Sequence, residues 1–209
     1  MNNKLTKIIS TIIPNKKINY FTFLVLTLGI ISGSIFLVLI SPNDKINVTT
    51  QITNLMSNIN DNNISIVQAL KNSLSINFTY VFLIWILGMS VIGIIFNIFL
   101  VYIKGFIIGF SISSIIYVYG IKGVLASIIY IFPHQLLNIL SVIILGIYSI
   151  MFTISLYKVI LGERNTGIRA FIKKYIYILI LCCVFTLISS SIEVLLTPAL
   201  FKLVIKLFV

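Results

Sequence analysis

The chain carries little charge, and acidic residues are nearly missing. Of its 209 residues 9% are charged, with four Asp or Glu against fifteen Lys or Arg. Between Phe78 and Tyr157 the only full charges are Lys104 and Lys122. Soluble globular domains carry roughly a quarter charged residues, whereas this chain is 59% hydrophobic with a mean hydropathy of +1.16. The sequence therefore excludes an ordinary water-soluble domain and indicates a protein that faces lipid.

Side chains that bind metals or catalyse reactions are also scarce. His134 is the only histidine, and the two cysteines, Cys182 and Cys183, are adjacent and so cannot form an ordinary disulfide. No HExxH motif, GxSxG motif or paired-aspartate arrangement occurs. We therefore expect no metal site, no cofactor and no enzymatic activity. The alternative is an intramembrane enzyme, whose activity would depend on His134.

A signal-peptide cleavage site is missing as well. The segment before Pro42 has a basic start, but its apolar stretch of about twenty residues is longer than the apolar region of a signal peptide. No small-x-small site follows that stretch before Pro42. The segment is predicted to be an uncleaved membrane anchor.

What the chain does have is apolar runs long enough to span a bilayer as helices, about twenty residues each. We predict an all-α, polytopic integral membrane bundle of about five transmembrane helices, forming one domain over 1–209. The expected spans are Tyr20–Ile40, Phe78–Ile103, Gly105–Tyr119, Val124–Leu156 and Tyr175–Thr197. Lys104 alone separates the second span from the third, which predicts a very tight turn there.

The fourth span is expected to be broken at Pro133 and His134. Before the break, Val124–Phe132 offers about nine apolar residues, roughly 14 Å of helix or half a bilayer. We interpret it as a half-span or a steep kink, because Pro133 removes an amide donor from the helix. His134 is interpreted as a capping group at this break, with a ligand role as the alternative.

Basic residues predict the orientation, because short cytoplasmic loops hold an excess of Lys and Arg. The N-terminal arm 1–19 carries four of the fifteen basic residues and the loop 158–174 carries five. Both are predicted to be cytoplasmic, and the loop 41–77 and the tail 198–209 extracytoplasmic. Membrane orientation and anionic lipid account for the net charge of +11, so we expect no nucleic-acid partner.

The loop 41–77 is predicted to contain two amphipathic helices. Their apolar faces comprise Val48, Ile52, Leu55 and Ile59 in the first and Val67, Leu70 and Leu74 in the second. Two interpretations stay open: packing onto the membrane or the bundle, or a docking face for an extracytoplasmic partner. The amphipathic tail 198–209 has the same two interpretations.

Small residues at helical spacing predict close contacts between helices. These residues are Gly29 and Gly33, Gly88 and Gly93, and Gly105, Gly109 and Ser113. Such contacts can lie inside one bundle or join two copies in a homo-oligomer. Glu193, the only carboxylate within a span, is expected to be either hydrated or paired with Lys122. A structural role and a role in transport are the two alternatives for it.

Several motifs carry a family resemblance. The chain reads WILGMSVIG from Trp85, YIKGFIIGF from Tyr102 and GIKG from Gly120 ahead of Pro133, and Ser190, Ser191 and Glu193 precede Pro198. This pattern resembles stage II sporulation protein M of endospore-forming Firmicutes over nearly the whole chain. The loop 41–77 matches poorly.

The resemblance implies a scaffold in the mother-cell membrane at the sporulation septum. Such a scaffold would recruit two peptidoglycan-degrading partners, stage II sporulation proteins D and P, for septal wall thinning and engulfment of the forespore. The alternative is a permease-like transport subunit, which the broken fourth span supports, because discontinuous helices often line substrate paths.

Overall fold

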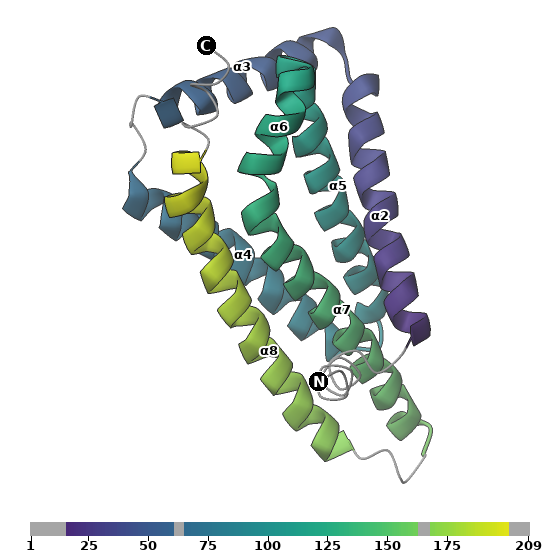
Figure 1. Ribbon diagram of the computed structural model, residues 1–209. Helices are drawn as coiled ribbons and strands as arrows, with labels where there is room; N and C mark the ends of the chain where they lie inside the picture. The colour runs from purple at the N-terminus through teal and green to yellow at the C-terminus, as the bar shows by residue number, and fades with distance from the viewer. Residues whose placement is uncertain (1–15, 61–64, 163–167, 201–209) are drawn as a thin grey trace, which may run out of the picture.

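The computed structural model describes residues 16–60, 65–162 and 168–200, and within these ranges the chain is almost entirely helical and contains no strand. The helices are α2 (Lys16–Leu39), α3 (Pro42–Asn60), α4 (Ile66–Gly88), α5 (Gly93–Tyr119), α6 (Ile121–Tyr130), α7 (Phe132–Ile160) and α8 (Ile168–Ser191), followed by the π-helical turn η1 (Ile192–Leu196) (Figure 1). Five helical segments are long and apolar enough to cross a membrane: α2, α4, α5, α7 and Arg169–Leu200. The predicted fold class, an all-α bundle with five spans, is confirmed.

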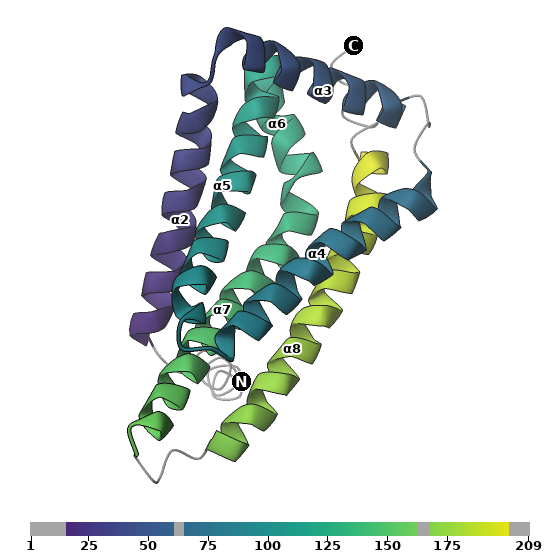
Figure 2. The same ribbon diagram turned by 180° about the vertical axis from the view of Figure 1, so that it is seen from behind.

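The long helices run between two ends of the bundle, and α3 lies across one of them (Figures 1 and 2). We call this the α3 end, and the opposite end, where α4 joins α5, the turn end. α2 runs from the turn end to the α3 end, where α3 crosses the bundle, and α4 returns to the turn end. α5 then runs to the α3 end, α6 and α7 return to the turn end, and α8 runs back toward the α3 end. The start of α2 and the end of α7 therefore lie at the same end, as an even number of crossings between them requires. Of the predicted terminal segments, residues 1–15 and 201–209 lie outside the described residues.

The predicted turn at Lys104 is wrong. The α4–α5 turn lies between Gly88 and Gly93, where the amides of Met89 and Ser90 donate to the carbonyls of Ile86 and Leu87, both at 3.0 Å. α5 runs through Lys104 without interruption, because lysine is a good helix former and its side chain is buried against the ring of Tyr80. The turn falls instead between two glycines, Gly88 and Gly93, and glycine is a weak helix former.

The α4 span also begins earlier than predicted, at Ile66 rather than Phe78. Ser65 caps its first turn, accepting a hydrogen bond from the amide of Gln68 at 3.5 Å. The second predicted amphipathic helix is therefore the first part of a membrane span, and only the first, now α3, is a separate element of the connection.

The fourth span is broken as predicted. α6 is a helix of 10 residues and α7 one of 29, and Ile131 between them has φ −90° and ψ −44°. Pro133 falls in the first turn of α7, where its missing amide costs no helical hydrogen bond. At the other end of α6, Gly120 adopts φ +59°, a conformation that favours glycine, and reverses the chain from α5.

Two apolar clusters form the core. The larger joins α2, α4, α5, α7 and α8 around Ile84, Leu145, Tyr148 and Tyr175, each at most 1% exposed. The smaller lies beneath α3 and comprises Met56, Ile59, Ile115, Ala126 and Ile131. α3 is thus attached to the bundle through its apolar side.

The closest helix contact joins α2 to α5 through four glycines. A Cβ added at Gly29 or Gly33 would overlap backbone atoms of α5, and one at Gly105 or Gly109 would overlap backbone atoms of α2. Hydrogen bonds extend this contact, from Tyr102 Oη to Ser32 Oγ at 2.7 Å and from Ser34 Oγ to the Gly109 carbonyl at 3.3 Å. In this chain the spacing therefore serves packing within one bundle, and Ser113 is half-buried farther along α5.

Candidate functional site

Buried polar side chains gather where α4, α7 and the end of α8 meet, toward the α3 end. The group, which we call the α3-end cluster, comprises Ser73, Asn77, His134, Asn138, Ser189, Ser190 and Glu193. All except the half-buried Glu193 are at most 9% exposed. Polar groups within a bilayer are costly unless they find partners, so their hydrogen bonds decide what the cluster can do.

Side-chain hydrogen bonds connect most of the cluster. Ser73 Oγ donates to Glu193 Oε2 at 2.6 Å, and Asn77 Nδ2 lies 3.3 Å from both Ser73 Oγ and Ser190 Oγ. Asn138 Nδ2 donates to Asn77 Oδ1 at 3.3 Å. Glu193 is thus oriented by a network from three helices, in which it accepts a hydrogen bond from Ser73 on α4.

Local backbone structure places Glu193 in a π-helical turn. The amide of Thr197 donates to the carbonyl of Ile192, five residues back, and Thr197 Oγ1 bonds to the same carbonyl at 3.0 Å. Pro198 follows and has no amide hydrogen to continue the regular ladder. Single π-turns occur frequently at functional sites, which makes Glu193 a candidate functional residue.

A cavity of about 310 Å³ lies next to this cluster, beneath α3. Its walls come from α3, α5, the α6–α7 break and η1. They include Gln51, Ile52, Leu55, Met56, Phe110, Ser111, Ser114, Tyr130, His134, Gln135 and Glu193. The side chains of His134 and Gln135 are only partly satisfied, because Nδ1 of the first and Oε1 of the second are buried without a hydrogen-bond partner.

A different arrangement of polar groups occupies the turn end. Thr153 Oγ1 and Tyr175 Oη donate to the carbonyls of Gly88 and Trp85, both at 2.9 Å. Ser149 Oγ lies 3.3 Å from the carbonyl of Ile84 and also contacts the Asn97 amide. The last carbonyls of a helix have no partner within it, so these side chains complete the end of α4.

Lys104 lies buried in the middle of α5, at 7% exposure. Its ammonium sits 5.5 Å from the centroid of the Tyr80 ring, and the Tyr80 hydroxyl donates to the carbonyl of Leu100. The carboxylate of Glu193 also acts on this ammonium electrostatically, although no ion pair joins the two groups within the described residues. A cation on an aromatic face is stabilised by the ring quadrupole, which accounts for a lysine at this depth.

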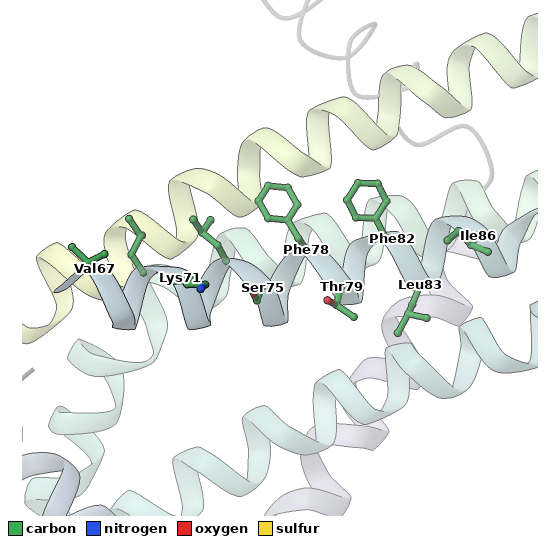
Figure 3. A pocket seen from close by; sticks show the side chains of 10 residues that line it. Val67, Lys71, Ser75, Phe78, Thr79, Phe82, Leu83 and Ile86 are labelled. Atoms are coloured by element: carbon green, nitrogen blue, oxygen red, sulfur yellow. The ribbon is translucent and has the colours of Figure 1, made fainter. Parts of the chain in front are cut away.

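One side of α4 presents an open, largely apolar surface region of about 830 Å³ (Figure 3). All ten lining residues belong to α4: Val67, Leu70, Lys71, Leu74, Ser75, Phe78, Thr79, Phe82, Leu83 and Ile86. Phe78 and Phe82 project to one side of the helix, and Thr79 and Leu83 to the other (Figure 3). We call these ten residues the α4 face.

The predicted docking residues divide between two surfaces. Val67, Leu70 and Leu74 lie on the α4 face, whereas Val48, Ile52 and Leu55 line the cavity beneath α3. Ile59 is 1% exposed and packs into the bundle, so it is closed to a partner while α3 stays in place. The sequence does not single out the α4 face as a whole, because Phe78 and Phe82 belong to an apolar run that predicts only a membrane span.

Comparison with known proteins gives one match. A family model described as Stage II sporulation protein M matches residues 22–198. No curated protein and no solved structure matches the chain. The matched region contains every helix from α3 to α8, and therefore the α4 face, the cavity and the α3-end cluster.

Proposed function

Because the chain belongs to the stage II sporulation protein M family, we propose that this multi-pass membrane protein is a scaffold of the engulfment machinery. It holds two peptidoglycan-degrading partners, stage II sporulation proteins D and P, at the septal membrane on the mother-cell side. The partners perform the hydrolysis of the wall, and the scaffold itself catalyses no reaction.

The observation that carries this proposal is the α4 face. Its apolar residues run along the whole helix from Val67, 79% exposed, to Ile86, 56% exposed. Lys71 and Ser75 lie at the end of the face toward α3, where the helix leaves the bilayer, and the phenylalanines lie deeper. A membrane-anchored partner can contact such a face both within the lipid and at its surface.

The proposed orientation puts the α3 end outside the cell. Lys16, Lys17, Lys158, Arg169, Lys173 and Lys174 all lie at the turn end, in the first turns of α2 and α8 or the last turn of α7. Basic residues that flank spans stay on the cytoplasmic side. The outer end of α4 then faces the compartment that contains the wall.

Positioning of the two partner enzymes at the membrane is enough to explain the proposed thinning of the septal wall. Binding to a membrane-fixed partner through a short connection raises the effective concentration of an enzyme toward the millimolar range. The requirement on the scaffold is contact area of the right shape and place, and the α4 face supplies it without any reactive group.

A permease-like transport subunit remains the alternative, and one observation favours it. Buried polar side chains recur along one face of α7, at His134, Asn138, Ser141, Ser149 and Thr153. Three of them, however, already bond to backbone carbonyls: Ser141 to Leu137, Ser149 to Ile84, and Thr153 to Gly88. Groups occupied in this way are poor ligands for a passing solute, so we favour the scaffold.

The scaffold is tested by truncating the α4 face. In the Phe78→Ala, Phe82→Ala double variant we expect recovery of stage II sporulation protein P with the purified membrane protein to fall by at least about tenfold, as for aromatic hot spots. Substitution is preferable to deleting the segment 41–77, because that deletion would remove α3 and the beginning of α4.

The matched control is the Phe21→Ala, Phe23→Ala double variant on α2. Phe21 is 45% and Phe23 56% exposed, similar to the 42% of Phe82, but they lie on another side of the bundle. This variant should retain the partner at the wild-type level. Undiminished recovery with the α4 variant, or an equal loss with both variants, would contradict the proposal.

A further inference from the structure

The cavity beneath α3 is separate from the α4 face and plays no part in the proposed scaffold contact. Its lining combines an apolar portion, including Ile52, Leu55 and Phe110, with a polar portion at the α6–α7 break and η1. A volume of about 310 Å³ is at the lower end of the range for small-molecule sites. It suits a headgroup and the first carbons of a chain rather than a whole lipid.

Glu193 is the only charged residue in the lining, which contains no lysine or arginine. Within the described part of the chain its carboxylate accepts one side-chain hydrogen bond, from Ser73, and is in no ion pair. A carboxylate at membrane depth is costly without a positive partner or a proton. The cavity therefore offers a negative site whose electrostatic neighbours in the described part of the chain, Lys104 and His134, form no ion pair with it.

Two further groups of the lining could accept hydrogen bonds. Gln135 Oε1 has no partner, nor does Nδ1 of His134, whose side chain is 5% exposed. Ser189 holds the backbone at this point, donating to the carbonyl of His134 at 2.7 Å. Buried polar groups are almost always satisfied, so these atoms mark the polar wall of the cavity as incomplete.

The chemistry of these three groups selects the ligand. An ammonium group carries three N–H donors, one positive charge and no acceptor. It complements a carboxylate, the free oxygen of Gln135 and, in the tautomer protonated at Nε2, the Nδ1 of His134. A quaternary ammonium has the charge but no N–H, and an anionic headgroup would meet the carboxylate with like charge. The apolar wall of α3 and α5 accommodates methylene groups next to the amine.

We propose that this cavity binds the primary ammonium headgroup of a membrane amphiphile, with Glu193 as its counter-ion. The headgroup enters beneath α3, at the level where the helix lies across the end of the spans (Figure 1). Ser73 is a positioning residue that fixes the carboxylate through the Asn77 network. The apolar chain lies along Leu55 and continues into the surrounding lipid.

The test uses the full-length protein in a neutral detergent, with decylamine, decyltrimethylammonium or decyl sulfate as probe. Decylamine should raise the thermal unfolding midpoint in a saturable way, and the other two probes should not. In nanodiscs with equal phosphatidylglycerol, phosphatidylethanolamine should stabilise the protein more than phosphatidylcholine. Equal effects of decylamine and decyltrimethylammonium, or of the two nanodisc lipids, would overturn the assignment of a primary amine.

Three variants test whether decylamine binds in this cavity. Glu193→Gln should weaken decylamine binding at least about tenfold, as loss of a close charge partner does, and Ser111→Phe should block it by filling the cavity while retaining the carboxylate. Asp44→Asn also removes one carboxylate at the α3 end, but Asp44 is exposed and outside the lining, so binding should be unchanged. Wild-type binding in both Glu193→Gln and Ser111→Phe, or an equal loss in Asp44→Asn, would overturn the proposal.

Discussion

At the turn end of α4, hydroxyl groups from α7 and α8 donate to backbone carbonyls, whereas at the α3 end the side chains of α4 bond to other side chains. Thr153 and Tyr175 complete the end of the helix with bonds of 2.9 Å. Ser73 and Asn77 instead connect to Glu193, Ser190 and Asn138, next to atoms that have no partner. The first arrangement satisfies the last carbonyls of α4, although Trp85 Nε1 nearby is also buried without a partner. The second lies beside a cavity and has capacity for a ligand. Stability and binding should therefore depend on different ends of the same helix.

The largest effect is expected at the turn end, from Gly88→Val. A Cβ at this position would overlap Ser149 and the Tyr175 hydroxyl, and the side chains that must move also cap α4. Overpacking of this kind costs about 3 kcal/mol. Equilibrium unfolding by SDS titration in mixed micelles measures the loss, with the exposed Ser90→Ala in the same turn as control. A Gly88→Val protein as stable as Ser90→Ala would show that this end is loosely packed.

A smaller effect is expected from Tyr175→Phe. The substitution leaves the aromatic stack on Phe152, with ring centroids 4.7 Å apart, but removes the hydrogen bond to the Trp85 carbonyl. Interhelical hydrogen bonds in membranes contribute roughly 0.6–1.5 kcal/mol. The same titration should show a loss in this range, and Tyr177→Phe, at an exposed position of α8, should show none.

The smallest effect on stability is expected at the α3 end, from Glu193→Gln. Glutamine retains an oxygen for the Ser73 hydroxyl and removes a charge from a half-buried site, so the free energy of unfolding should change by less than about 1 kcal/mol. The comparison of the two ends predicts this outcome together with the loss of amine binding described above. A destabilisation as large as that of Gly88→Val would mean that Glu193 holds the bundle together.

Hydropathy and charge predict the class of the protein and the number of its spans, but not the bounds of the second and third spans. α2 and the break before α7 follow from one long apolar run and from Pro133, which are local signals. The α4–α5 turn was misplaced because the apolar run continues through Met89, Val91 and Ile92, and the only visible interruption, Lys104, is accommodated by Tyr80 from another helix.

The α3-end cluster could not be predicted from the sequence, because its members come from three separate helices. Ser73 and Asn77 lie in the segment 41–77 that the sequence predicts to be a loop, and Asn138 stands alone in an apolar run. Their hydrogen bonds depend on how α4 and α8 pack against α7, which no local pattern specifies. Pro198 was the one local signal near the π-turn, since a proline disturbs the helical ladder before it.

The slant of α4 has a consequence for the surrounding lipid. α4 meets α5 at the turn end and diverges from it toward α3, which spans the widened end with its 19 residues, roughly 28 Å of helix. The described helices therefore cover a wider cross-section at the α3 end than at the turn end (Figure 2). In the proposed orientation they would displace more area from the outer leaflet than from the inner one. A flat bilayer must deform around such an inclusion, and a sheet that bulges toward the broad side accommodates it with less elastic strain.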